Sequence, residues 1–311
     1  MNFLDKVLDE LREPLESVPI VKLPEDLQTA RQMPIPSDGQ SETVRITERT
    51  IAGGDGQQML IKIYEPIHKD DEPLPAVLWN HGGGYVLGHP NSDDRLCESF
   101  VDNLKCVVVS PDYRLAPEHP YPAAVEDCYA SLKWTKDNYM EFNIDLKRIS
   151  VAGGSAGGGI TAAIALLARD RGGPDICFQM PLYPMIDDRN ITSSSLEIID
   201  YQAVWFKANN IAAWKMYLGE IGNKKIPQYA APARADNLEG LPPTYTCVGQ
   251  LDPFRDETIN YVARLASAGV DVEFKLYPGC FHAFEHIAPD AEISKQAKNE
   301  YINALSKAFT T

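Results

Sequence analysis

The stretch Val151-Ala152-Gly153-Gly154-Ser155-Ala156-Gly157-Gly158 decides the fold of this 311-residue chain. It follows β-branched residues and leads into an alanine-rich run, which predicts a buried strand, a tight turn at Ser155 and a buried helix. Small residues are needed on both sides of such a turn because strand and helix almost touch there. The serine hydroxyl would be exposed at a helix N-terminus, where developing negative charge is favoured. In this context the Gly-x-Ser-x-Gly pattern is typical of a nucleophile elbow.

Two other interpretations of this glycine-rich stretch do not fit. A dinucleotide-binding Gly-x-Gly-x-x-Gly fails because residue 155 is Ser, and no Lys follows as a phosphate loop requires. The uncharged run from Ile149 to Ala168 is long enough to consider a membrane span, but the glycines in its first half make a poor spanning helix.

The composition narrows the class of protein. Apolar residues make up 44% and charged residues 23%, which is typical of a globular protein of one large domain or two small ones. The net charge of −15, without basic blocks, argues against nucleic acid or an anionic membrane as partner and favours uncharged substrates. Charged residues interrupt the first twelve positions, so we expect no signal peptide and a cytoplasmic location.

The cysteines are expected to be buried, reduced thiols, because none form a Cys-x-x-Cys pair and most lie in apolar runs. No cluster of ligands suggests a metal site, and we expect no cofactor. The cysteines are Cys97, Cys106, Cys128, Cys177, Cys247 and Cys280.

Short β-rich runs alternate with longer helical ones, which predicts parallel strands joined by helical crossovers. The predicted strands are Thr43–Thr50, Met59–Tyr64, Ala76–Asn80, Cys106–Ser110, Ile149–Ala152, Phe178–Tyr183, Thr244–Val248 and Val272–Tyr277. The predicted helices are Asp93–Leu104, Ala123–Asp137, Ala156–Asp170, Arg255–Ser267 and Glu292–Ala308. The first two strands could form an antiparallel hairpin across residues 53–56. We therefore predict an α/β fold with an eight-stranded, mostly parallel sheet.

Two regions interrupt the alternation and are predicted to form a helical cap. Residues 1–40 are helical and then proline-rich, and residues 186–226 carry several aromatic residues without strand signals. The catalytic core would comprise residues 41–185 and 227–311. The alternative is that the insertion is an ordinary surface helical excursion.

A second motif, His81-Gly82-Gly83-Gly84-Tyr85, follows another apolar strand. Consecutive glycines let backbone N–H groups approach a substrate oxygen without obstruction by side chains. The amides of Gly83 and Gly84, together with that of Ala156, would form an oxyanion hole. His81 is interpreted as a brace for the loop.

A serine nucleophile needs a base and an acid that orients the base. His282 directly follows the last predicted strand, at the end of the sheet where such sites gather, and His286 is the runner-up. Asp252 lies at the end of the preceding strand, and Asp256 is the runner-up one helical turn later. The order Ser155, Asp252, His282 is the order of a hydrolase triad on this type of sheet.

The sequence resembles the hormone-sensitive lipase-like (bacterial family IV) α/β-hydrolase carboxylesterases. The resemblance covers about residues 40–310 and rests on five motifs in combination. They are His81-Gly82-Gly83-Gly84, Tyr113-Arg114-Leu115-Ala116-Pro117-Glu118, the elbow, Asp252-Pro253-x-x-Asp256-Glu257 and Gly279-x-x-His282-x-Phe284. The resemblance implies carboxylester hydrolysis with Ser155 as nucleophile, His282 as base and Asp252 as orienting acid, and a cap built from the two regions above.

One residue departs from the family pattern. The family usually has Asp or Thr directly before the nucleophile, where this chain has Gly154. A polar side chain is therefore missing beside Ser155, which would loosen the elbow or enlarge the pocket. We expect Gly154→Asp to be tolerated. Glu118 and Asp127 could pass for a carboxylate pair for acid/base work, but we interpret Glu118 as a brace for a proline-rich turn and Asp127 as an anchor for a helix.

The predicted function is a serine carboxylesterase for small esters of short to medium acyl chain, acting through an acyl-enzyme. Tyr85, Trp205, Phe206 and Trp214 are predicted to bind substrate, although the insertion aromatics could instead form the core of the cap. An amidase or deacetylase using the same triad is the alternative, and a non-catalytic small-molecule receptor is the more distant one. A homodimer through an edge strand stays open.

Overall fold

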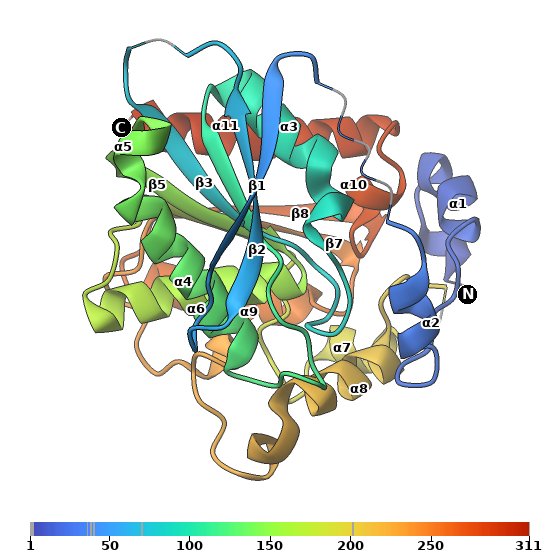
Figure 1. Ribbon diagram of the computed structural model, residues 1–311. Helices are drawn as coiled ribbons and strands as arrows, with labels where there is room; N and C mark the ends of the chain where they lie inside the picture. Colours follow the sequence, from blue (N-terminus) through green and yellow to red (C-terminus); the bar gives the residue numbers. More distant parts are fainter. Residues whose placement is uncertain are drawn as a thin grey trace.

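The structure, a computed structural model, describes residues 3–35, 37, 39, 41–69, 71–200 and 202–310. One eight-stranded sheet runs through it (Figure 1). Its strand order is β1-β2-β4-β3-β5-β6-β7-β8. The strands are β1 (Val44–Ala52), β2 (Gln58–Pro66), β3 (Leu74–Asn80), β4 (Val107–Pro111), β5 (Ile144–Gly154), β6 (Phe178–Leu182), β7 (Thr244–Leu251) and β8 (Val272–Phe281). β1 and β2 form an antiparallel hairpin and β2 is antiparallel to β4, whereas all pairs from β4 through β8 are parallel. The predicted mostly parallel sheet is confirmed.

Helices cover both faces of the sheet because the central strands are apolar on both sides. In β3, Ala76 and Leu78 pack with one group of helices, and Val77 and Trp79 pack with the other. One face carries α3 (Asp94–Leu104) and α11 (Glu292–Thr310); the other carries α4 (Ala123–Asp137), α6 (Ala156–Arg171) and α9 (Arg255–Ser267). The five predicted long helices are confirmed, with bounds that differ by at most two residues.

The N-terminal region and the 186–226 insertion lie against each other beside the core (Figure 1). The first contains η1 (Leu4–Lys6), α1 (Asp9–Glu16) and α2 (Leu27–Gln32), and the second contains α7 (Ser193–Glu197), α8 (Lys207–Leu218) and η3 (Gly219–Asn223). The amide of Asn209 in α8 accepts from Leu23 N–H (2.9 Å) and donates to Val21 C=O (2.8 Å). Residues 1, 2, 36, 38, 40 and 201 of the predicted cap lie outside the described residues. The exact cap boundaries stay a prediction.

The remaining short elements are η2 (Pro90–Asp93), α5 (Tyr139–Phe142), η4 (Pro232–Arg234) and α10 (Phe284–Ile287). The cysteines are all free, and five of them are buried. Across the described ranges, no helix combines the length and apolar character that crossing a membrane would need.

Candidate active site

Ser155 lies in the turn between β5 and α6, as the sequence predicted. Its backbone has φ 58° and ψ −119°, a conformation that a non-glycine residue adopts rarely and that marks a strained site. The turn requires a close approach of two backbones, since a Cβ on Gly157 would lie 2.0 Å from the carbonyl oxygen of Asn80. Glycine is therefore needed where the helix leaves Ser155.

The structure brings Ser155, His282 and Asp252 together from loops after three different strands. Nε2 of His282 lies 3.0 Å from Oγ of Ser155, and its Nδ1 lies 2.7 Å from Oδ2 of Asp252. The other carboxylate oxygen of Asp252 accepts the backbone N–H of Phe254 at 2.8 Å, which fixes the plane of the carboxylate. This linear arrangement can pass a proton from the hydroxyl to an oriented imidazole.

The three side chains are almost inaccessible, with exposures of 7% for Ser155, 4% for His282 and 0% for Asp252. The rings of Tyr183 and Phe254 each lie 5.1 Å from the His282 imidazole, and both are nearly perpendicular to it. In such a dry site, electrostatic interactions are stronger than in water.

The glycine loop follows β3 and lies over the elbow. A Cβ on Gly82 would lie 3.5 Å from Cβ of Ser155, so this loop and the serine are in contact. Gly84 has φ +62° and its α-carbon faces the indole of Trp205, which leaves no room for a side chain. The N–H of Ala156 is the first of α6, where helix geometry leaves amides without an intrahelical acceptor.

His81 braces the loop, as the sequence analysis proposed. Its ring stacks on Tyr113 at 4.1 Å, and the Tyr113 hydroxyl donates to the His81 carbonyl at 2.8 Å. Burial lowers the pKa of His81 to about 4, so it is neutral at pH 7. His286, the runner-up for the base, is about half exposed and lies 4.0 Å from Asp93.

The aromatic residues that were predicted to bind substrate lie in different places. The ring of Trp205 lies 6.5 Å from that of His282 and covers the glycine loop. Tyr85 stacks on Tyr217 at 3.9 Å and donates its hydroxyl to the carbonyl of Met185. Trp214 packs beside this stack, in the core beneath the loop. Phe206, the residue before α8, is buried.

The carboxylates that could have been mistaken for catalytic groups have structural partners. Glu118 binds Arg31 of α2 through two hydrogen bonds of 2.9 and 2.8 Å. Asp127 of α4 accepts from the Arg114 side chain at 2.8 and 2.9 Å and from the N–H of Gly54 at 2.9 Å.

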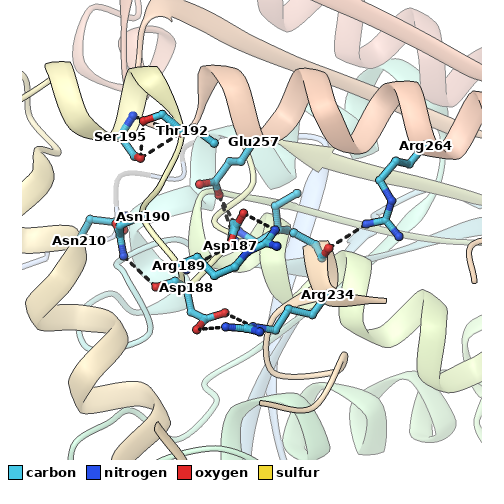
Figure 2. Close-up of polar contacts among 12 residues, drawn as sticks. Asp187, Asp188, Arg189, Asn190, Thr192, Ser195, Asn210, Arg234, Glu257 and Arg264 are labelled. Atoms are coloured by element: carbon cyan, nitrogen blue, oxygen red, sulfur yellow. Dashed lines mark hydrogen bonds and ion pairs between the residues drawn. The ribbon is translucent and has the colours of Figure 1, made fainter. Parts of the chain in front are cut away.

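The runner-up acid, Asp256, contacts the first turn of α7, where its carboxylate accepts the backbone N–H of Ser194 at 2.7 Å. Its neighbour Glu257 was not predicted to have a role. Figure 2 shows it where the chain leaves the core: Glu257 Oε1 accepts from the N–H groups of Ile186 (2.9 Å) and Asp187 (3.3 Å). Nearby, Asp188 holds Arg234 by two hydrogen bonds. The segment after Asp252 thus ties the start of the insertion to the core.

Three residues near the triad were not predicted from the sequence. Phe254 and Tyr183 contact the His282 ring, and Glu285 accepts a hydrogen bond from the Tyr183 hydroxyl. Phe254 lies inside the Asp252 motif, whereas Glu285 directly follows the His282 motif and is not part of it. Tyr183 was predicted only as the end of a strand. The space beside Gly154 is occupied by Tyr183, since a Cβ there would lie 2.9 Å from the Tyr183 hydroxyl. The expected tolerance of Gly154→Asp is therefore revised, because that side chain requires Tyr183 to move.

Comparisons with known proteins agree with this architecture. A family model described as the alpha/beta hydrolase fold matches residues 77–286. Esterase LipI of Mycobacterium tuberculosis is 36% identical over 98% of both chains. Carboxylesterase NlhH of the same species is 37% identical over 90% of this chain and 87% of its own. The solved structure called Bacterial Heroin Esterase superimposes with a TM-score of 0.94 at 36% identity, covering 99% of both chains. This chain therefore belongs to the α/β-hydrolase fold family, in its hormone-sensitive lipase-like branch of carboxylesterases.

Proposed function

We propose that this chain is a serine carboxylesterase that hydrolyses small, uncharged esters of short to medium acyl chain through an acyl-enzyme. The observation that carries the proposal is the alignment of Ser155 Oγ, His282 and Asp252 at 3.0 and 2.7 Å beneath a glycine loop. The relatives named esterase and carboxylesterase support the reaction class.

In the first step, Ser155 Oγ forms a bond to the ester carbonyl carbon while His282 Nε2 takes the hydroxyl proton. The carbonyl oxygen becomes an oxyanion and accepts hydrogen bonds from the backbone N–H groups of Gly83, Gly84 and Ala156. Asp252 holds the imidazole in the tautomer that can accept the proton and stabilises the imidazolium that forms. When the tetrahedral intermediate collapses, the bond to the alcohol oxygen breaks and His282 gives the alcohol its proton.

In the second step, water attacks the acyl-enzyme as His282 takes one of its protons. The bond between Ser155 Oγ and the acyl carbon then breaks, and the proton returns from His282 to the serine. The products are the carboxylic acid and the alcohol, and the enzyme returns to its starting state.

The preference for small substrates follows from the position of Trp205. Its indole contacts Gly84 and lies 6.5 Å from the ring of His282, so we infer that it limits the space for substrate beside the triad. We propose Trp205 and Phe206 as substrate contacts, and infer that Tyr85 and Trp214 act indirectly, by packing beneath the loop. The net charge of −15 disfavours anionic esters.

An amidase or deacetylase would use the same first step and differs in its leaving group. We therefore propose comparing p-nitrophenyl acetate with p-nitroacetanilide, with a fluorophosphonate probe to label the nucleophile. We expect ester turnover to exceed anilide turnover by more than a hundredfold, with the label on Ser155 by peptide mass. Comparable turnover would favour the amidase, and labelling of another residue would refute the nucleophile. The cytoplasmic location and homodimer stay predictions.

A further inference from the structure

Gly154, at which the nucleophile motif departs from the family pattern, lies against Tyr183. A Cβ atom on Gly154 would lie 2.9 Å from the hydroxyl oxygen of Tyr183, and 3.2 and 3.3 Å from its Cε2 and Cζ. Optimal contacts of such atoms lie at about 3.5–4.0 Å. The phenol therefore occupies the volume that a side chain at residue 154 would need.

Tyr183 is held in a backbone conformation that it would not adopt freely. Its φ is +33°, in the region that non-glycine residues rarely occupy. Its backbone N–H donates to the carbonyl of Cys247 at 2.7 Å, and its hydroxyl donates to Oε1 of Glu285 at 2.5 Å. Strained conformations of this kind persist only where surrounding contacts determine them. The hydrogen bond to Glu285 is one of those contacts.

Glu285 is a carboxylic acid at a buried position. It lies in α10, three residues after His282, and is 3% exposed. Its second oxygen, Oε2, is buried without a hydrogen-bond partner among the residues that the structure describes. Burial raises the pKa of this carboxyl, so the neutral form is favoured. A buried carboxyl with an unpaired oxygen costs stability. The Glu285 carboxyl nevertheless binds Tyr183, which lies beside the base, and this contact suggests a role beyond packing.

Tyr183 also contacts His282, since the two rings are 5.1 Å apart with an angle of 80° between their planes. It therefore touches both the residue before the nucleophile and the base. We propose that Tyr183 and Glu285 are positioning residues for His282, and that residue 154 is glycine because their arrangement requires it. The proposal rests on the proposed function, in which His282 is the base.

The expected effect of losing this pair is on the chemical step. Without the hydrogen bond from its hydroxyl to Glu285, Tyr183 can relax its backbone. The imidazole of His282 then loses the ring contact that keeps Nε2 within hydrogen-bond distance of Ser155 Oγ. A misplacement of about 1 Å can cost up to roughly a hundredfold in rate, so we expect about a tenfold loss of kcat. KM should stay within about twofold, because Tyr183 acts through His282 and not on the substrate.

The test measures kcat and KM on p-nitrophenyl butyrate, with kcat normalised to active sites titrated by a fluorophosphonate. Tyr183→Phe and Glu285→Ala should each lower kcat about tenfold. Glu285→Gln should retain kcat within about twofold, since its amide oxygen can accept from the Tyr183 hydroxyl. The double variant Tyr183→Phe/Glu285→Ala should be no slower than either single variant, because both remove one interaction.

A second cycle tests the role of Gly154. Gly154→Ala should lower kcat in the wild-type background but cost several-fold less in the Tyr183→Phe background, where the nearest atom is gone. Tyr64→Phe is the matched control, because it removes a hydrogen bond of the same kind, from a buried tyrosine to the buried Asp94 at 2.5 Å. It should lower the unfolding midpoint and leave kcat unchanged.

Three results would overturn the proposal: a change in kcat of less than twofold in Tyr183→Phe and Glu285→Ala, a rise in KM that accounts for the whole loss, or an equal cost of Gly154→Ala in both backgrounds. Glu285→Ala and Glu285→Gln do not depend on the Tyr183→Phe variant. If Tyr183→Phe folds poorly, the comparison of these two Glu285 variants still tests the proposal. If wild-type protein hydrolyses the ester and Ser155→Ala does not, these failures count against the positioning pair alone. If Ser155→Ala is as active as wild type, the proposed function itself fails.

Discussion

Replacing Asp252 by Asn should identify the orienting acid with almost no change in shape. The asparagine amide can present either its oxygen or its NH₂ group to His282, and the hydrogen bond from Phe254 N–H decides which orientation is favoured. The backbone N–H of Phe254 donates to Oδ1 of Asp252, so the oxygen of an asparagine would stay there. The NH₂ group would then face Nδ1 of His282, at the site where the carboxylate lies 2.7 Å away. This selects the tautomer that carries its proton on Nε2, which cannot accept the proton of Ser155.

The size of the loss can be worked from the cost of turning the amide over. The flipped amide would accept from Nδ1–H but oppose its NH₂ to the N–H of Phe254, which leaves a buried donor unpaired at about 1–3 kcal/mol. The neutral acceptor would also give up the charge-assisted part of the bond to the imidazolium, which is worth about 1.5–3 kcal/mol. Together these terms raise the barrier by about 2.5–6 kcal/mol, so kcat should fall by roughly 10² to 10⁴-fold.

The assay is the steady-state hydrolysis of p-nitrophenyl butyrate at fixed pH, with Asp256→Asn as the matched control. Asp256 lies four residues away and accepts the N–H of Ser194 in the first turn of α7, whereas the carboxylate that faces His282 is that of Asp252. The Asp256→Asn variant should keep kcat within about threefold and should lower stability by roughly 1 kcal/mol, because the hydrogen bond to Ser194 N–H loses its charge. A loss of kcat of tenfold or less in Asp252→Asn would refute the assignment of the acid. A loss of kcat in Asp256→Asn that is larger than that in Asp252→Asn would also refute it.

Three further predictions concern the predicted cap and its attachment to the core. Trp205→Ala should shift the preferred acyl chain to greater length. Each additional buried methylene contributes about 0.8 kcal/mol, or roughly fourfold in kcat/KM. An unchanged chain-length profile would contradict the proposed contact of Trp205 with the substrate. Burial raises the pKa of Glu257 well above its ordinary value, so its contribution to stability is fully present below about pH 4.3 and is lost as pH rises towards the folded-state pKa. Glu257→Gln should therefore gain stability relative to wild type between pH 4 and pH 8 in urea unfolding, and a pH-independent difference would argue against a neutral buried carboxyl. Asn209→Ala should expose the N-terminal region to protease, because it removes the partners of Leu23 N–H and Val21 C=O at a cost of about 1–3 kcal/mol; equal cleavage rates would show that the two regions are held by other contacts.

The sequence predicted the sheet well where the strands are continuously apolar. β3, β4 and β6 are buried at every residue, and the apolar residues of β3 and β4, above all valine and leucine, are visible without a structure. β5 begins at Ile144 instead of the predicted Ile149, because its first half carries exposed charge and lacks an apolar pattern. The helices α7 and α8 of the insertion were not predicted individually, since neither shows an amphipathic repeat in the sequence.

The candidate site was predictable only in part, for a geometric reason. Ser155, Asp252 and His282 follow strands, and the order of strands brings their loops to one edge of the sheet. Tyr183 and Glu285 carry no local motif, and their relation to Gly154 exists only once three loops meet. The same applies to Glu257, whose partners are backbone amides about seventy residues away in the chain.

The most direct test of the proposed chemistry is initial rates on p-nitrophenyl esters from acetyl to palmitoyl, with Ser155→Ala measured beside the wild type. We expect turnover that peaks at short to medium chains and is lost in Ser155→Ala, while the variant keeps the unfolding midpoint of the wild type. Turnover retained in a clean preparation of Ser155→Ala would contradict the assigned nucleophile, and a folded wild-type protein inactive on every chain would contradict the esterase function.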